Sequence, residues 1–379
     1  MSERHVFASP MPSLDIPDAP LSALVLNKAG SMPDAVALID GTSGATTTFA
    51  ELSDAVHRLA GGLAAAGVGP GSCVALMAPT CPEFAIVFHA VAVCGASITT
   101  VNPTYTDREL RHQLEDAGAT LLVAAAAFLD VARAGTDGTR VDEIVTIGAA
   151  DGHRSIDALM GDPIEQVAVD VAGTVVALPY SSGTTGLPKG VMLTHRNLVA
   201  NVCQLNAILP VEAGQTGLAV LPFFHIFGME AAMNAWLAAG VTVVTLPRFD
   251  MGQALSLIET HRVAHLYAVP PIVLGLAKSP LVDERDLSSL RRIVCGAAPL
   301  GADLTREAAA RVGCPIVQAY GMTELSPLSH ANPPSGDVPG SSGVAAPDTE
   351  SRVVDPDGND LGVDEVGELL VRGPQVMKG

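Results

Sequence analysis

The segment from Tyr180 to Gly190, YSSGTTGLPKG, has the residue types of a loop that binds phosphate. Its glycines allow backbone N–H groups to converge on an anion. The serine and threonine hydroxyls add donors, and Lys189, one of four lysines in the chain, adds a positive charge. We therefore expect phosphate to be bound by Ser181, Ser182, Gly183, Thr184, Thr185, Gly186 and Lys189.

The same segment argues against two common enzyme classes. A Walker A loop requires Gly-Lys-Ser/Thr, whereas this chain has Pro188-Lys189-Gly190. The chain also has no GxSxG motif, the strained turn that exposes a nucleophilic serine. The sequence therefore supports neither a P-loop kinase nor a serine hydrolase.

A second segment, Gln318-Ala319-Tyr320-Gly321-Met322-Thr323-Glu324, has the groups for the rest of a nucleotide site. The carboxylate of Glu324 is a hard oxygen ligand of the kind that Mg²⁺ prefers. Thr323 can donate to a phosphate oxygen, and the ring of Tyr320 can stack on a purine. Beside the first loop, this segment predicts a second wall of one nucleotide site.

Two further turns complete the pattern. The turn at 221–228 contains His225 among apolar residues, and a lone histidine in such a setting is more often a core residue. The turn at 295–300 consists of small residues, Cys-Gly-Ala-Ala-Pro-Leu, against which a flat ring could lie. Each is weak evidence alone, but all four segments occur in one chain.

Short apolar runs alternate with helical patterns along the chain, which is typical of βαβ units around mostly parallel sheets. Capping boxes at Thr48–Glu51 and Thr106–Glu109 predict two helix starts. We expect an α/β fold with a first subdomain at 1–172 and a second, carrying the nucleotide loop, at 173–332. A small antiparallel β unit is expected at 333–379.

Composition excludes several functions. The net charge of −19 disfavours a basic surface for nucleic acid or anionic lipid. A hydrophobic fraction of 48% with 16% charged residues excludes a disordered chain. The six cysteines form no CxxC pair, so we expect no zinc site and a reducing, cytoplasmic location. Residues 1–18 lack the apolar run of a signal peptide.

The apolar stretch at 218–246 raises the question of a membrane span. It is interrupted by Pro222, Gly228 and Gly240, whereas a spanning helix needs about 20 continuous apolar residues. We therefore expect a buried strand, turn, helix and strand.

The four segments, in this order, resemble those of the acyl-adenylate-forming enzymes. This group contains acyl–CoA synthetases, firefly luciferase and peptide-synthetase adenylation domains. The segments 269–274, 296–301 and 318–324 most resemble coumarate–CoA ligases, and the weaker motif Gly367-Glu368-Leu369 with Val371-Arg372-Gly373 follows. The resemblance covers nearly the whole chain.

This resemblance implies a two-step ligase that uses ATP, Mg²⁺ and coenzyme A. A carboxylate attacks the α-phosphate of ATP to give acyl-AMP and pyrophosphate, and a thiol then displaces AMP. The implied catalytic residues are Lys189, His225, Thr323 and Glu324, with Glu324 as the Mg²⁺ ligand. Adenine would lie between the two walls formed by Gly296, Ala297, Ala298, Pro299, Gln318, Ala319, Tyr320, Gly321 and Met322.

The implied acyl pocket comprises His225, Ile226, Phe227, Tyr267, Ala297, Ala319 and Gly321. Coumarate–CoA ligases commonly have Tyr where this chain has Phe227, and Lys where it has Val294. Both differences remove polar groups, so we expect a cinnamate-like or medium-chain acid. Two alternatives remain open: an adenylation domain that loads a carrier protein, although Glu230 is displaced from the expected acidic position, and a nucleotide-binding module without catalysis.

Members of this group also carry a ribose-binding aspartate, a hinge and a C-terminal lid domain with a catalytic lysine. None of these follows Glu368 in this chain. The resemblance therefore implies a large N-terminal domain that is weakly active by itself and whose partner is the missing lid.

Overall fold

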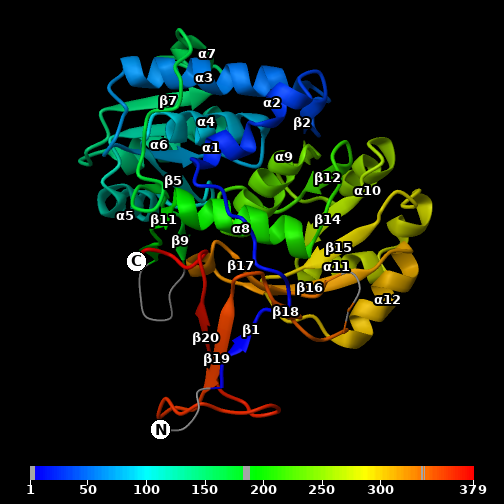
Figure 1. The fold of residues 1–379 in the computed structure, drawn as a ribbon. Helices are drawn as coiled ribbons and strands as arrows, with labels where there is room; N and C mark the ends of the chain where they lie inside the picture. The colour runs from blue at the N-terminus through cyan, green and yellow to red at the C-terminus, as the bar shows by residue number, and fades with distance from the viewer. Residues whose placement is uncertain (1–4, 182–187, 334–335, 337) are drawn as a thin grey trace.

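The computed structural model describes residues 5–181, 188–333, 336 and 338–379. Two large sheets with helices around them form the body of the molecule, and a small sheet projects from it (Figure 1). The expected α/β class with mostly parallel sheets and a small antiparallel unit is confirmed.

The first large sheet has, in the described residues, six strands in the order β11-β8-β5-β4-β6-β7. Its parallel strands are β4 (Cys73–Met77), β5 (Ser97–Val101), β6 (Leu121–Ala125), β7 (Glu143–Ile147) and β8 (Val175–Ala177), and the antiparallel edge strand is β11 (Leu193–Thr194). Side chains of a strand alternate between the two faces. Accordingly, Val74 and Leu76 of β4 belong to one apolar cluster, whereas Ala75 and Met77 belong to another.

Helices cover both faces of this sheet. Their bounds are α3 (Phe49–Ala65), α4 (Pro82–Val93), α5 (Asp107–Ala117), η1 (Ala126–Phe128), α6 (Leu129–Thr136) and α7 (Ile156–Leu159). Both expected capping boxes are present, because Thr48 and Thr106 accept from the amides of Glu51 and Glu109. α4 is apolar on all sides and almost entirely buried, which agrees with its place between other elements.

The second large sheet has nine described strands in the order β18-β17-β16-β15-β14-β12-β13-β2-β3. The parallel centre is formed by β16 (Ile316–Gly321), β15 (Arg292–Cys295), β14 (His265–Ala268), β12 (Thr216–Ala219), β13 (Thr242–Thr245) and β2 (Val36–Asp40). The antiparallel edges are β3 (Thr46–Thr48), β17 (Leu328–Ala331) and β18 (Val344–Ala345).

The elements that connect and cover this sheet are α1 (Leu21–Val25), α2 (Lys28–Ser31), α8 (His195–Ile208), the π-helix η2 (Phe227–Ala235), α9 (Trp236–Ala239), α10 (Met251–Thr260), α11 (Pro270–Lys278), η3 (Pro280–Glu284), α12 (Ala302–Val312) and η4 (Thr323–Leu325). One continuous apolar core joins the two large sheets through α4, α8 and η2. The apolar stretch at 218–246 forms β12, a turn, η2 with α9, and β13, as expected. Within the described residues, no helix is long and apolar enough to span a membrane.

The sheets do not follow the sequence boundary expected after residue 172. β2 and β3 precede that boundary yet belong to the second large sheet, because β2 pairs with β13. β8 and β11 follow it yet belong to the first. The small sheet combines β1 (Phe7–Ala8), β19 (Glu350–Val354) and β20 (Glu368–Arg372), so the expected C-terminal unit also contains an N-terminal strand.

Candidate functional site

A cavity of about 850 Å³ lies where the four sequence segments meet. Its walls come from residues after β5, from the hairpin of β9 (Tyr180–Ser181) and β10 (Lys189–Gly190), and from the turns after β12 and β15. The end of β16 with η4 completes it. In open parallel sheets, ligands bind at the carboxyl ends of the strands, and these segments follow carboxyl ends.

The hairpin brings Lys189 back beside Ser181, since these two residues face each other in the antiparallel register. Residues Ser182, Gly183, Thr184, Thr185 and Gly186, all expected in the phosphate loop, lie outside the described residues. Both Ser181 and Lys189 line the cavity, and Lys189 is exposed. The expected loop therefore begins and ends at the cavity wall.

Tyr180 fastens this hairpin to α5. Its hydroxyl donates to Oδ2 of Asp116 at 2.5 Å, and its ring lies 3.2 Å from the position that a Cβ of Gly190 would occupy. Burial and the neighbouring Asp116 carboxylate raise the pKa of Tyr180. The phenol therefore remains a donor at neutral pH, and a larger residue at 190 would push the ring away.

Glu324 lines the cavity and contacts the hairpin directly, because Ser181 Oγ donates to its Oε1 at 3.0 Å. Thr323, beside it in η4, is buried and lines the cavity. The described residues contain no group of three or more His, Cys, Asp or Glu that could hold a metal. A single carboxylate fits Mg²⁺ that is also held by substrate phosphates and water, the usual arrangement for this ion.

The wall expected to hold adenine comes from two turns that require small residues. A Cβ on Gly321 would lie 2.0 Å from the carbonyl oxygen of Pro327, and one on Gly296 would lie 3.0 Å from the ring of Phe227. Tyr320 lines the cavity and is 39% exposed, and its ring is inclined at 63° to that of His330. Ala297, Ala319 and Met322 also line the cavity.

Three residues expected in this wall are placed differently. Ala298 and Pro299 are exposed and do not line the cavity. Gln318 is buried behind it, where its Oε1 accepts from the backbone N–H of Leu300 at 3.0 Å. Because this bond closes the turn after β15 onto β16, Gln318 supports the wall and is not part of its surface.

His225 stands at the exposed mouth of the cavity. Its Nδ1 accepts from the backbone N–H of Phe227 at 3.2 Å, so the neutral ring carries its proton on Nε2. Partial desolvation of the ring by the adjoining cavity walls lowers its pKa. At neutral pH, His225 is therefore a neutral Nε2–H donor.

Ile226 and Phe227 line the cavity next to His225. Tyr267, which was expected beside them, does not line it. The Tyr267 ring is 3% exposed and stacks behind Phe227, with ring centroids 5.8 Å apart. β14 ends at Ala268, one residue after Tyr267, so this side chain still lies within the covered part of the sheet.

The sequence reasoning missed several wall residues. Thr100, Asn102 and Tyr105 line the cavity from the end of β5 and the segment after it, as does Met377 from the far end of the chain. The strand before Asn102 could be recognised in the sequence, and the strand-end rule then points to the polar residues that follow it. Nothing local in the sequence identifies Met377, whose backbone N–H donates to the Glu324 carbonyl at 2.9 Å.

The described geometry agrees with comparisons to known proteins. The family profile "AMP-binding enzyme" matches residues 26–379. The chain belongs to the AMP-binding enzyme family. It is 39% identical to 4-coumarate–CoA ligase 5 of Oryza sativa subsp. japonica, over 100% of this chain and 72% of that protein. It is 38% identical to 4-coumarate–CoA ligase of Pinus taeda, over 99% and 72%.

Solved structures of CoA ligases have the same fold as this chain. This AMP-binding enzyme superposes on a long-chain-fatty-acid–CoA ligase from Archaeoglobus fulgidus with a TM-score of 0.91 and 28% identity, covering 100% of this chain and 79% of that one. ATP-bound MatB from Rhodopseudomonas palustris gives a TM-score of 0.86 and 31% identity, covering 96% and 72%. The expectation of an acid–thiol ligase that uses ATP, Mg²⁺ and coenzyme A is confirmed.

Proposed function

We propose that this AMP-binding enzyme activates an apolar aryl acid of the cinnamate type, or a medium-chain acid, for transfer to coenzyme A. The observation that carries the choice of acid is Phe227, which lines the cavity next to His225. A polar hydroxyl on the substrate that finds no partner costs about 1–3 kcal/mol on burial. An apolar ring at this place therefore favours an acid without one.

An aromatic column supports this choice. Phe227 stacks on Tyr267, whose ring centroid lies 4.6 Å from that of Trp236. Trp236 covers Gly217 so closely that a Cβ there would lie 2.6 Å from the indole. The two packed rings of Tyr267 and Trp236 thus fill the space behind Phe227, which favours a compact acid over a long chain. Val294 is buried beside Tyr267 and does not line the cavity. Of the two positions that differ from coumarate–CoA ligases, only Phe227 therefore affects the polarity of the acyl pocket.

In the proposed first step, the chain positions the two reactants and stabilises developing charge. Lys189 and Ser181 would hold the terminal phosphates, Thr323 would donate to the α-phosphate, and Tyr320 would stack on adenine. His225 would donate from Nε2 between the acid and the α-phosphate. Mg²⁺ on Glu324 would neutralise phosphate charge as pyrophosphate leaves.

The carrier-protein alternative would require an acidic group near the acyl pocket to hold an amino acid's ammonium. Glu230 is fully buried in η2, where its Oε2 accepts from Nδ2 of Asn234 at 2.7 Å. Burial raises the pKa of Glu230 well above its usual value. A neutral carboxyl that does not line the cavity disfavours amino acid substrates. The cavity also contains Lys189 and Glu324, which disfavours a module that only binds nucleotide.

A cytoplasmic location is also part of the proposal. It is supported by the six cysteines, which are free in the described residues. Burial raises the pKa of several of these thiols, for example of Cys295 to about 12, which makes them poor nucleophiles.

The test is an ATP–pyrophosphate exchange assay with cinnamate, coumarate, caffeate, hexanoate, dodecanoate and phenylalanine. We expect the highest kcat/KM with cinnamate or hexanoate and background exchange with phenylalanine. A tenfold or greater preference for caffeate over cinnamate would contradict the proposed substrate class. Separate reactions with free coenzyme A and with a carrier protein identify the acceptor.

A further inference from the structure

Two adjacent arginines, Arg291 and Arg292, lie where the central strands of the nine-stranded sheet begin. This edge, formed by the amino ends of the strands, is opposite the nucleotide cavity. Arg292 is the first residue of β15, and its register partner His265 is the first residue of β14. β12, β14, β15 and β16 run parallel, so their amino ends share one edge, whereas their carboxyl ends lead to the cavity. Any ligand at the arginines would therefore occupy a separate site.

The surface is hollowed at this edge. A cavity of about 270 Å³, here named the amino-edge hollow, is lined by Pro210, Glu212, Gln215, His265, Arg291, Arg292, Pro315 and Val317. A neighbouring cavity of about 590 Å³ shares Gln215 and Arg291 with it. A water molecule occupies about 30 Å³ in the liquid, so the hollow has room for a small polyatomic ion.

The guanidinium of Arg292 is buried without a counter-charge. Only 7% of the residue is exposed, the single described hydrogen bond of its side chain runs to the Pro210 carbonyl at 2.8 Å, and its Nε has no partner among the described residues. Neither Arg291 nor Arg292 forms an ion pair with a described carboxylate. A buried charge is normally paired, because removing it from water is costly.

One carboxylate, that of Glu212, also lines the hollow, but it forms no ion pair with either arginine. Oε2 of Glu212 accepts from Nε2 of Gln215 at 2.9 Å, and the Gln215 Oε1 in turn accepts from Nε2 of His265 at 2.6 Å. Burial, together with the charges of Arg292 and Arg291, lowers the pKa of His265 to about 4. His265 is therefore neutral at pH 7, and the positive charge in the hollow comes from the two arginines.

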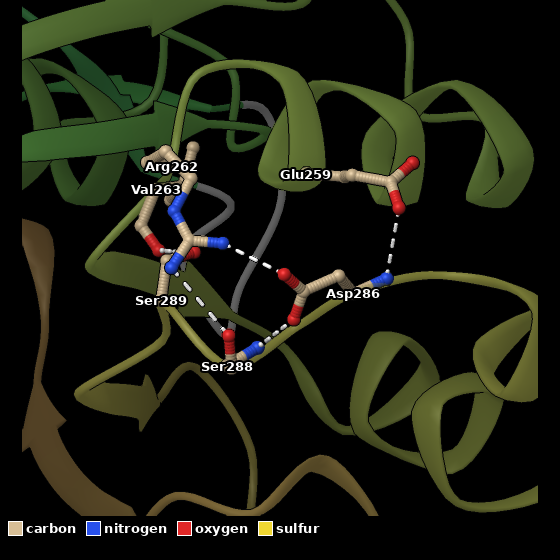
Figure 2. Close-up of polar contacts among 6 residues, drawn as sticks. All are labelled: Glu259, Arg262, Val263, Asp286, Ser288 and Ser289. Carbon is tan, nitrogen blue, oxygen red and sulfur yellow. Dashed lines mark hydrogen bonds and ion pairs between the residues drawn. The ribbon is translucent and has the colours of Figure 1, made fainter.

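Arg262, in the neighbouring cavity, is paired with a carboxylate, as charged side chains in such places usually are. Figure 2 shows its guanidinium between Asp286 and Ser288, with a bond of 2.8 Å to Oδ2 of Asp286. Asp286 is itself held by the backbone N–H of Ser288, and its own N–H donates to Glu259. This arginine is thus neutralised within the protein, whereas Arg291 and Arg292 are not.

We propose that the amino-edge hollow binds a small oxyanion, either inorganic phosphate or a short carboxylate, between Arg292 and Arg291. Charge-assisted bonds from guanidinium to such an anion are short and strong, and the bound anion supplies the counter-charge that Arg292 lacks. Such a site would stabilise the second sheet from the edge opposite the reaction.

Calorimetric titration with inorganic phosphate, at constant ionic strength and with AMP saturating the nucleotide cavity, tests this proposal. We expect saturable binding to the wild type and at least a tenfold loss of affinity in Arg292→Met. Arg306→Met is the matched control, because it removes one exposed arginine and should leave phosphate affinity unchanged. Titration with acetate distinguishes the two anions: the one that binds more tightly identifies the class.

Thermal unfolding provides the second readout. Without phosphate, Arg292→Met should be as stable as the wild type or more so, because an unpaired buried charge has been removed. With phosphate, only the wild type should gain stability. If Arg292→Met fails to fold, the exposed Arg291→Met should still weaken phosphate binding. No saturable binding to the wild type, equal binding by chloride, or a wild-type response in the arginine variants would each overturn the proposal.

Discussion

Ser181 Oγ donates to Oε1 of Glu324 at 3.0 Å, although 143 residues separate them. The bond joins the start of the phosphate hairpin to the carboxylate proposed to hold Mg²⁺. The serine thus helps to fix the orientation of Glu324. The carboxylate is half-buried, and its second oxygen has no recorded partner among the described residues.

The first prediction concerns this carboxylate. Glu324→Gln preserves an acceptor for Ser181 but removes the negative charge, so the expected Mg²⁺ ligand is weakened without loss of the turn. We expect ATP–pyrophosphate exchange to fall about 10²-fold, with a higher Mg²⁺ concentration at half-maximal rate. Glu350→Gln, which changes an exposed ion pair with Arg372, is the control. An unchanged Mg²⁺ dependence in Glu324→Gln would remove this residue from the metal site.

The second prediction concerns Lys189. It is exposed, lies opposite Ser181 in the hairpin and forms no ion pair among the described residues. Lys189→Ala should therefore leave thermal stability nearly unchanged while lowering exchange by roughly 10²-fold, the usual effect of losing one preorganised donor. Lys278→Ala, on the surface of α11, provides the control. Exchange within about twofold of wild type would show that the hairpin does not hold the phosphates.

The third prediction is a pH dependence that depends on His225. Because the surroundings lower its pKa, the neutral ring should persist below the ordinary histidine value of about 6.5. Protonation at lower pH would place a proton on Nδ1 and break the bond from the Phe227 N–H. Exchange should therefore be constant from pH 8 down to about 6.5 and fall in more acidic solution. His225→Gln should be slower at every pH and lack this acidic decrease, as measured under saturating ATP.

Much of this site could be predicted because its signals are local. The capping boxes at Thr48 and Thr106 each follow from a few neighbouring residues, and the structure has both. That the segments at Tyr180 and Thr323 line one cavity could be predicted because both carry groups that bind phosphate. The parts that could not be predicted depend on distant pairing: β2 joins β13, and the strand at Phe7 joins β19. No window of sequence contains both partners.

The placement of Tyr267 shows the same limit on a smaller scale. From the sequence alone, a tyrosine near the end of a strand can either line a pocket or be buried beneath neighbouring side chains. The outcome is decided by Trp236, which lies over Gly217 of the neighbouring strand and holds Tyr267 beneath Phe227. Gln318 is likewise explained only by the backbone N–H of Leu300.

The fourth prediction tests Phe227 as the determinant of substrate polarity. Phe227→Tyr adds a hydroxyl at the cavity wall and leaves the stack on Tyr267 possible. We expect the kcat/KM ratio of coumarate to cinnamate to rise by roughly tenfold, because the substrate hydroxyl gains a partner. Phe223→Tyr is the control: Phe223 is fully buried against Phe84 and does not line the cavity. It should lose stability without changing the ratio.

The last prediction concerns the part of the reaction that the described cavity does not complete. The chain spans 72% of the length of the rice ligase, and the proposed lid would come from the remainder. The nucleotide walls are present here, so AMP should bind. Exclusion of water and charge stabilisation on the α-phosphate normally require a closing lid.

We therefore expect calorimetry to detect AMP binding by the 379-residue chain and a turnover assay to detect little acyl–CoA. A chimera that continues at Gly379 with the C-terminal region of the rice ligase should gain both affinity and turnover. Full acyl–CoA synthesis by the 379-residue chain alone would show that the catalytic groups all lie in the cavity that Ser181 and Glu324 line.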